Sequence, residues 1–415
     1  MSYRNAIDYL ESKTKVLELC NDFGARIAVC PDWNGRVMTS TADGIDGDSY
    51  GLVNVMQIEE RLKAQGHVMP HQLIGGEDQL VLSPEGGPFS LFYDYDSEAS
   101  AIHRHHIEPP IGYTEGPFEI DTVPREPEMR LRRNVRMQNL AGARFDIDLI
   151  RSIRLHSEND MARLFDPVIL AALEQPAISY VSYRTVNTLV NRGATFSKYS
   201  GLLSLRVRGM YNSTPYHVLV IPFKPGHEEQ LGKRFSADFF GTAPHGRLRL
   251  MPESLLLRTD GRFRCQIGVS RARAVSRVAA IDFRNGVFSI MEFNLPEDAD
   301  SCDYLCNDYC ETNEGAEADF VATRERYLLE NGAGNPYAGE VVRAYGNGLS
   351  DTDGDTHSSY YEFDTFSPAV ELQKNESITH IQHTTHIHAD RATLVFLLDA
   401  LFQIDFDTVY HRMLS

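Results

Sequence analysis

The stretch from Val341 to His388 concentrates acidic, basic and aromatic side chains. We predict two or three strands here, and alternation along a strand would bring several of these side chains onto one face. Carboxylates and imidazoles transfer protons, and aromatic rings stack on flat apolar surfaces such as those of sugars. The stretch therefore predicts a site for acid–base chemistry, with the candidates Tyr345, Asn347, Glu362, His380, His383 and His386.

The three late histidines are spaced by three residues. On a helix this spacing would line one face, whereas on a strand His380 and His386 point one way and His383 points the other. The β-branched residues between them favour a strand. Three histidines can bind zinc, but hydrogen-bonded histidines on threonine-rich strands are more frequent, so we expect neither a metal nor another cofactor.

Two glycine pairs mark a second stretch, from His67 to Asp94. Glycine permits a tight turn or a close backbone approach, and such turns can direct neighbouring carboxylates into a cleft. Hairpins in any β protein use the same pairs, so the pattern also fits ordinary turns. The pairs are Gly75-Gly76 and Gly86-Gly87, and the adjacent carboxylates are Glu77, Asp78 and Glu85.

A third stretch, around NTLVNRG, carries the amides of Asn187 and Asn191. An amide side chain both donates and accepts hydrogen bonds, which suits sugar hydroxyls. Asparagine also ends strands and satisfies turns, and that is the commoner reason for any single asparagine.

Short strands with turn residues between them dominate the rest of the chain. Asn34-Gly35, Asp260-Gly261 and Asn285-Gly286 each predict a hairpin, and RFDIDLIRSIRL alternates as a half-buried strand does. Helices are expected near the amino end, over Met161 to Leu173, within Ala316 to Asn331, and after a capping Asp390. The pattern predicts an all-β sandwich or barrel with a few short helices.

We expect residues 1–23 to form a helical lead-in and residues 24–415 to form a single β domain. An insertion near 295–320 carries nine acidic residues and no lysine or arginine, which is typical of a solvated segment. DTDGD, from Asp351 to Asp355, lacks the glycine and glutamate positions of a calcium-binding EF-hand loop, so it is interpreted as a surface turn.

Composition excludes several partners. The 415 residues carry 58 acidic and 40 basic side chains, a net charge of −18, which disfavours binding to a phosphate backbone. No apolar run is long enough to span a membrane, and the amino end lacks the layout of a secretory signal, so we expect a cytoplasmic protein. The spacing of Cys302, Cys306 and Cys310 matches neither a zinc knuckle nor a disulfide scaffold. The oligomeric state is left open.

Several motifs occur together in a recognisable order. GGED with PEGGPFSLF is followed by NTLVNRG with GLLSLRVRGM, and then by YEFDTFSPAVEL with ITHIQHTTHIH. From about Gly24 onward the chain resembles an uncharacterised group of proteins related to galactose mutarotases, or aldose 1-epimerases. The resemblance implies a galactose-mutarotase-like β-supersandwich of two large antiparallel sheets, with a small sugar or oligosaccharide as the partner.

The resemblance also implies roles for individual residues. Mutarotation needs a base for the anomeric hydroxyl proton and an acid for the ring oxygen. Glu362 resembles the catalytic glutamate of mutarotases, although Pro368 follows one residue later than in those enzymes. The signature histidines are replaced by Thr188 and Ile74. The implied acids are therefore His71 or His386, and the implied sugar-binding residues are Glu77, Asp78, Asn187, Asn191, Tyr345, Asn347 and His383.

Because both signature histidines are absent from their usual places, other functions stay open at this point. One alternative is a carbohydrate-binding protein that does not catalyse a reaction. Another is a relative of polysaccharide lyases or hydrolases, since one fold hosts several chemistries.

Overall fold

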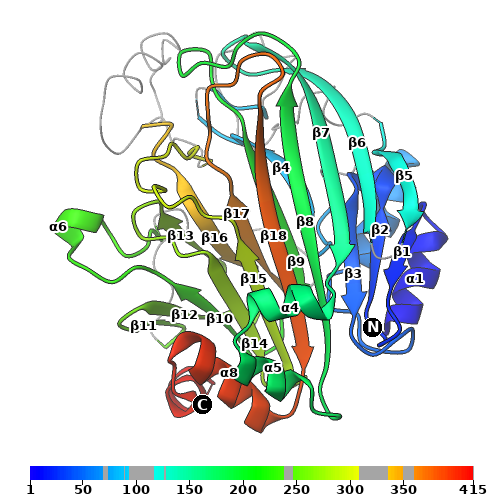
Figure 1. Ribbon diagram of the computed structural model, residues 1–415, viewed down its shortest axis with the longest axis vertical. Coiled ribbons are helices and arrows are strands. Elements are labelled where there is room, and N and C mark those ends of the chain that lie inside the picture. Colours follow the sequence, from blue (N-terminus) through cyan, green and yellow to red (C-terminus); the bar gives the residue numbers. More distant parts are fainter. Residues whose placement is uncertain are drawn as a thin grey trace.

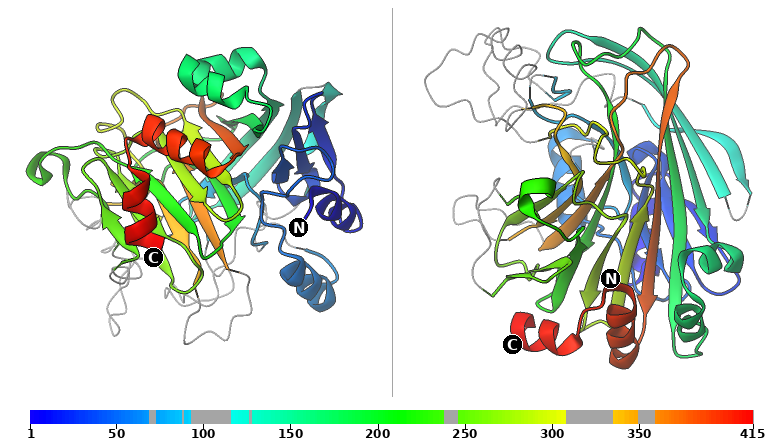
Figure 2. Two further views of the ribbon diagram at one scale, coloured as in Figure 1. Left: turned by 90° about the horizontal axis from the view of Figure 1, so that it is seen from below. Right: turned by 60° about the vertical axis from the view of Figure 1, so that its left-hand side comes forward.

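The computed structural model describes residues 1–68, 73–87, 89–92, 116–125, 128–237, 246–307, 335–348 and 359–414. This part of the chain consists mainly of antiparallel strands with a few short helices, which confirms the predicted all-β class. Three sheets are present, and they form two layers (Figures 1 and 2).

One layer is a ten-stranded sheet with the order β11-β12-β10-β14-β15-β18-β8-β7-β6-β5. Its long central strands run across the front of the molecule in Figure 1. The strands are β5 (Glu119–Arg125), β6 (Glu128–Gln138), β7 (Arg144–Leu155), β8 (Ser179–Asn191), β10 (His217–Pro222), β11 (Leu248–Leu250), β12 (Ser254–Arg258), β14 (Arg277–Asp282), β15 (Val287–Phe293) and β18 (Ser377–His388).

The second layer combines a five-stranded and a three-stranded sheet. An isolated bridge between Val37 of the smaller sheet and Asp78 connects the two, and a second bridge joins Gly51, after that sheet, to Tyr211. The five-stranded sheet has the order β13-β16-β17-β9-β4. Its strands are β4 (Gln79–Ser83), β9 (Ser204–Asn212), β13 (Cys265–Ser270), β16 (Glu340–Gly346) and β17 (Tyr360–Phe366), and the smaller sheet contains β1 (Leu17–Cys20), β2 (Arg26–Cys30) and β3 (Arg36–Thr41).

The core lies between the layers in two apolar clusters. One packs the three-stranded sheet and β4 against β6, β7 and β8, with Leu82 and Leu149 among its members. The other packs β9, β13, β16 and β17 against β10, β12, β14 and β15, with Phe363 and Leu219 among its members. Burial of apolar surface on both sides of this interface is the main contribution to stability.

Helices cover outer surfaces of the sheets. An apolar cluster packs α4 (Glu158–Leu164), α5 (Pro167–Leu173), α8 (Arg391–Phe402) and α9 (Phe406–Val409) on the outer face of the ten-stranded sheet (Figure 1). Helices α1 (Tyr3–Glu11) and α2 (Val55–Gln65) pack on the three-stranded sheet. Shorter helical segments are α6 (Glu228–Leu231), the 3-10 turn Pro31–Trp33 and Tyr410–Leu414.

Two of the predicted helices follow from local chemistry. Asp390 caps α8 by accepting a hydrogen bond from the Thr393 amide at 2.8 Å, as its position before the apolar run indicates. The helix predicted over Met161 to Leu173 is divided in two, because Pro167 starts a new helix at its first position. The sequence analysis did not predict α2, and the helix predicted within Ala316 to Asn331 lies outside the described residues.

Among the described helices, none is both long and apolar enough to cross a membrane.

Two of the three predicted hairpins are confirmed. Asn34 and Gly35, with φ of 63° and 58°, turn the chain between β2 and β3, and Gly286 lies in the turn between β14 and β15. The prediction at Asp260-Gly261 is wrong, because β12 and β13 on either side belong to different sheets. Asp260 there is bound by Arg247 and Arg258, which hold the crossover between the layers.

The glycine pair Gly75-Gly76 is required by close packing. Both residues have positive φ, and a Cβ on Gly76 would lie 2.3 Å from Cδ of Arg36. A Cβ on Gly75 would lie 2.4 Å from the Leu52 carbonyl oxygen. The two glycines therefore allow the backbone to pack closely at the junction between the three-stranded and five-stranded sheets.

We expect Gly76→Ala to destabilise the protein more than Gly66→Ala does. Gly66 also has positive φ, but no atom of the described residues lies within 4 Å of its Cβ position, so its substitution adds backbone strain alone, about 1 kcal/mol. At Gly76 overpacking adds roughly 1–3 kcal/mol. Urea unfolding of the two variants measures the difference, and equal losses would refute the packing argument.

Candidate functional site

Residues of β17 alternate between the two faces of the five-stranded sheet. Tyr361 and Phe363 belong to the cluster that packs against the ten-stranded sheet, and the Thr365 hydroxyl lies 2.8 Å from His380 Nε2 on β18. Glu362 and Asp364 therefore project to the opposite side. We call this side the outer face of the five-stranded sheet; it carries Arg206, Arg208 and Met210 of β9, Arg343 and Tyr345 of β16, and Tyr360, Glu362 and Asp364 of β17.

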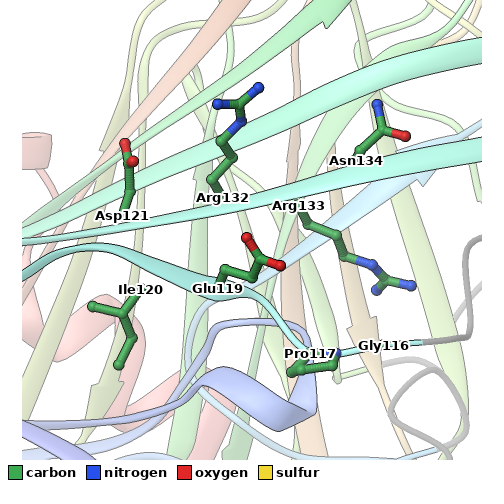
Figure 3. Close-up of a pocket in the computed structure, with 8 residues that line it drawn as sticks. All are labelled: Gly116, Pro117, Glu119, Ile120, Asp121, Arg132, Arg133 and Asn134. Carbon is green, nitrogen blue, oxygen red and sulfur yellow. The ribbon is translucent and has the colours of Figure 1, made fainter.

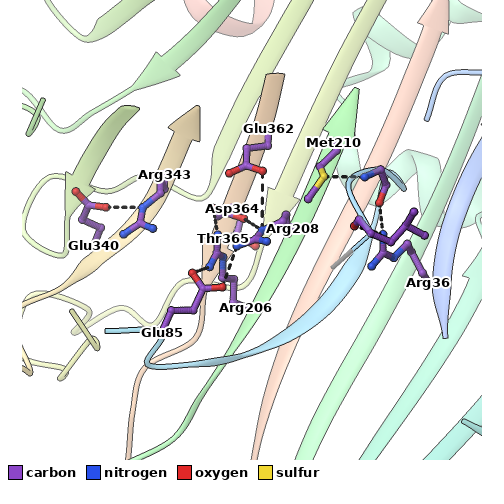
Figure 4. A network of polar contacts seen from close by, with 12 residues as sticks. Arg36, Glu85, Arg206, Arg208, Met210, Glu340, Arg343, Glu362, Asp364 and Thr365 are labelled. Atoms are coloured by element: carbon purple, nitrogen blue, oxygen red, sulfur yellow. Dashed lines mark hydrogen bonds and ion pairs between the residues drawn. The ribbon is translucent and has the colours of Figure 1, made fainter. Parts of the chain in front are cut away.

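Two arginines and two carboxylates on the outer face form a closed group, which we call the arginine–carboxylate square (Figure 4). Arg206 lies 2.5 Å from Glu85 Oε2 and 2.6 Å from Asp364 Oδ2. Arg208 lies 3.0 Å from Glu85 Oε1 and 3.4 Å from Asp364 Oδ1. Each carboxylate thus bridges both guanidinium groups, and the four charges sum to zero.

Glu362 lies beside this square without joining it. Its Oε2 is 3.9 Å from Arg208 Nε, which is beyond hydrogen-bond distance, and its side chain is 13% exposed. Burial raises the pKa of Glu362 to about 7, and the attraction of Arg208 offsets only part of that rise. A carboxyl group with such a pKa can accept or release a proton near neutral pH.

Aromatic and amide groups lie next to Glu362. Tyr345 is its cross-strand partner on β16, and the rings of Tyr345 and Tyr360 have centroids 5.9 Å apart. The Tyr345 hydroxyl accepts a hydrogen bond from Arg264 Nε at 2.9 Å and donates one to Asn347 Oδ1 at 3.0 Å. The structure therefore brings three sequence-predicted residues together here, Tyr345, Asn347 and Glu362.

Glu77 and His386 lie elsewhere, in the interior between the layers. Both side chains are fully buried, and Glu77 Oε2 is 3.6 Å from His386 Nε2. His386 Nδ1 lies 2.7 Å from the Ser289 hydroxyl, and its ring stacks on Tyr50. Because Glu362 projects from the opposite face of the five-stranded sheet, His386 and Glu362 do not face one cavity.

Burial controls the ionisation of this interior pair. It raises the pKa of Glu77 to about 8, a rise that the nearby hydroxyls of Ser40 and Tyr183 only partly oppose. It lowers the pKa of His386 to about 3. At neutral pH both groups are therefore mostly uncharged, which is how a buried acid and base without compensating charges are tolerated.

Asp78 and Asn187 are held in a second interior group. Arg151 donates to both, and the Thr185 hydroxyl donates to Asp78 Oδ2 at 2.9 Å. All four side chains are fully buried. This group joins the start of β4 to β7 and β8, so these residues link the two layers and do not line a surface.

The remaining sequence-predicted residues also lie apart from Glu362. Asn191 donates to the Ala194 and Leu372 carbonyl oxygens at 2.8 and 2.9 Å, which secures the end of β8. His383 Nδ1 lies 3.0 Å from His156 Nε2 on the outer side of the ten-stranded sheet, opposite to His380 and His386 as its strand position predicts. His71 and the DTDGD turn lie outside the described residues.

Sequence analysis did not include Arg206 and Arg208 among the site residues. The signal was available, because LRVRGM places two arginines on alternate positions of a strand, which puts both on one face. Glu85 was noted beside its glycine pair but was given no role. The sequence did not show that Glu85 pairs with these arginines, since Glu85 is separated from Arg206 by 121 positions.

A pocket opens at the edge of the ten-stranded sheet between β5 and β6 (Figure 3). Both of its arginines contact neighbours: Arg133 donates to Asn34 Oδ1 at 2.9 Å, and Arg132 lies 2.9 Å from Asp148. None of the sequence-predicted site residues lines it. The lining residues are Gly116, Pro117, Glu119, Ile120, Asp121, Arg132, Arg133 and Asn134.

Within the described ranges, no group of three or more histidine, cysteine, aspartate or glutamate side chains has the geometry to hold a metal ion. His380 Nε2 is bound to Thr365 and His383 pairs with His156, so these histidines have protein partners.

The protein therefore belongs to the class of all-β proteins in which two layers of antiparallel sheet face each other. Solved structures with a similar arrangement include a protein from Escherichia coli provisionally described as an aldose 1-epimerase, with 8% identity, coverage of 90% of this chain and 98% of that chain, and a TM-score of 0.48. The Slr1438 protein from Synechocystis has 11% identity, 91% and 96% coverage and a TM-score of 0.47.

A galactose mutarotase-like protein from Lactobacillus casei has 8% identity, 90% and 100% coverage and a TM-score of 0.44. At these values the similarity carries no argument about chemistry. The chain belongs to a family described as a family of unknown function (DUF6786), whose model matches residues 1–324 and 316–413. None of the curated proteins matches it.

We expect Glu77→Gln to change how stability depends on pH. The folded-state pKa of about 8 lies above the ordinary value of 4.5, so the stability from the protonated form is complete below about pH 4.5 and is lost as pH rises through 8. Removing this titration should reduce the decline of the unfolding free energy with rising pH. The scale of the effect is about 1.4 kcal/mol per unit of pKa shift. Urea unfolding between pH 5 and 9 measures the slope.

The control for this experiment is Glu228→Gln, which removes an exposed carboxylate. Its stability should follow that of the unmodified chain at every pH. A slope for Glu77→Gln identical to that of the control would contradict a raised pKa at Glu77.

Proposed function

We propose that the outer face of the five-stranded sheet binds a small, uncharged sugar and that Glu362 transfers a proton at its anomeric centre. The single observation that carries this proposal is the position of Glu362: its side chain is 13% exposed and 3.9 Å from Arg208, and burial raises its pKa to about 7. The resemblance of YEFDTFSPA to the glutamate strand of aldose 1-epimerases supports the reaction type.

The neighbours of Glu362 suit a sugar. The Tyr345 and Tyr360 rings lie beside it, with 6% and 8% of each residue exposed, and the Asn347 amide can both donate and accept hydrogen bonds. Arg206 and Arg208 are both neutralised by carboxylates, and Arg343 lies 3.1 Å from Glu340. A uronate would have to compete with these pairs, which favours a neutral ligand over the polyanionic substrates of lyases.

In the proposed reaction, the Glu362 carboxylate removes the proton from the anomeric hydroxyl while an acid protonates the ring oxygen. The bond between the anomeric carbon and the ring oxygen breaks, the resulting aldehyde rotates, and the ring closes on either face. Of the acids that the resemblance implies, His386 is fully buried between the layers, so we do not propose it as the acid. His71 remains the proposed acid from the sequence alone.

A carbohydrate-binding function without catalysis is the second candidate. Its support is the placement of His380, His383 and His386, which all have partners away from Glu362. Both candidates use the same surface, and they differ in whether a bound sugar turns over.

We expect the protein to accelerate equilibration of freshly dissolved α-D-glucose or α-D-galactose, with a rate that rises with pH through about 7 as Glu362 ionises. Glu362→Gln should lower the rate by at least about 100-fold, the smaller part of the range for general base catalysis. Polarimetry measures the rate, and isothermal titration measures sugar affinity. Glu228→Gln is the control, since it removes an exposed carboxylate of α6.

The outcomes separate the two candidates. Sugar affinity without acceleration by the unmodified protein would select the binding function. Equal rates for Glu362→Gln and the unmodified protein would remove Glu362 from catalysis, and absence of both affinity and acceleration would refute the proposal.

A further inference from the structure

Three carboxylates lie around the Arg208 guanidinium, two of them in the arginine–carboxylate square. Arg208 is 3.0 Å from Glu85, 3.4 Å from Asp364 and 3.9 Å from Glu362. The first two contacts are within hydrogen-bond distance, and the third is not (Figure 4). Arg208 is thus hydrogen-bonded to Glu85 and Asp364 but not to Glu362, although Glu362 and Asp364 lie on the same strand.

Asp364 is the cross-strand partner of Arg208, and Glu85 contacts Arg208 from the other side. One of its oxygens binds Arg206 and the other binds Arg208, so it fixes both guanidinium groups from the side opposite to β17. Although burial opposes ionisation of Glu85, Arg206 and Arg208 lower its pKa to about 2. Glu85 therefore stays charged throughout the neutral range and holds Arg208 continuously.

We infer that Glu85 is a positioning residue, which draws the Arg208 guanidinium away from Glu362 and so leaves the Glu362 carboxyl free to exchange a proton. An Arg208 that paired closely with Glu362 would stabilise its anion and make it a weak base. The importance of this arrangement for catalysis rests on the proposed function. The electrostatic claim itself needs no sugar and can be tested without one.

Other charged and titratable groups also face Glu362. From β9 come Arg206 and Arg208, and from β17 itself come Tyr360 and Asp364. From β16 come Tyr345 and, two residues away on the same face, Arg343. Arg206 is fixed by two short contacts and Arg343 by Glu340, so Arg208 is the cation among these with a contact to Glu362.

The experiment measures the titration of Glu362 directly. The full chain is labelled with 13C at glutamate side-chain carboxyls, and the Glu362 signal is identified by its loss in Glu362→Gln. We expect a midpoint near pH 7 in the unmodified protein. Glu85→Gln should lower that midpoint by about one pH unit or more, because Arg208 can then pair with Glu362, and Arg208→Met should raise it.

Removing Glu85 also removes a negative charge, which by itself would lower the midpoint. The double variant Glu85→Gln/Arg208→Met separates the two effects, as in a double-mutant cycle. If Glu85 acts through Arg208, adding Glu85→Gln to Arg208→Met should shift the midpoint by less than half of the shift seen in the unmodified chain. An equal shift in both backgrounds, or none in either, overturns the inference.

Two further variants complete the design. Glu228→Gln, which removes an exposed carboxylate of α6, is the control and should leave the midpoint within about 0.3 pH unit, a small fraction of the roughly one-unit spread of protein carboxyl pKa values. Glu85→Asp keeps the charge and pairing with Arg206 but reaches less far toward Arg208, so its midpoint should lie between those of Glu85→Gln and the unmodified protein. This variant also tests the inference if Glu85→Gln does not fold, and an unchanged midpoint in it would count against the inference.

Activity distinguishes failure of this inference from failure of the proposed function. If both hold, Glu85→Gln moves the ascending limb of kcat against pH to lower pH and leaves KM unchanged. If the midpoint moves as expected but no sugar is turned over, the inference stands and the proposed function fails. If sugar is turned over but the midpoint does not depend on Arg208, the inference fails alone.

Discussion

The alternation of side chains along β9 and β17 is the constraint on which the rest of this structure depends. These strands must supply apolar groups such as Tyr361 and Phe363 to the core on one side. Their other side is then set by the same two-residue period and carries Arg208, Glu362 and Asp364. A shift of one residue would bury the charges and expose the aromatic rings, so core packing fixes the register of the candidate site as well.

The cost of burying charged side chains is offset differently on the two sides of the five-stranded sheet. In the interior, Asp78 is compensated by Arg151, while Glu77 and His386 reduce the cost of burial by staying mostly uncharged at neutral pH. On the outer face, charges are paired in closed groups and Glu362 is left beside them. The same residue types are therefore fully buried in the interior, whereas on the outer face Glu362 is 13% exposed.

Much of the architecture could be predicted from the sequence. The all-β class, the turns at Asn34-Gly35 and Asn285-Gly286, and the Asp390 cap all follow from short-range rules of backbone geometry. The predictions were weaker where distant segments meet. Glu77 and His386 were predicted as site residues, but their residue types carry no information about which side of a sheet they occupy.

The sequence by itself determined the alternation of each strand, the positions that need glycine, and the acidic character that disfavours nucleic acid. Only the tertiary structure decided that Glu85 joins Arg206 and Arg208, and that Glu362 shares its face with Tyr345 and not with His386. The physical reason is range. Backbone propensity and periodicity act over a few residues, whereas the pairing that sets a carboxyl group's ionisation depends on strands that are brought together from opposite ends of the chain.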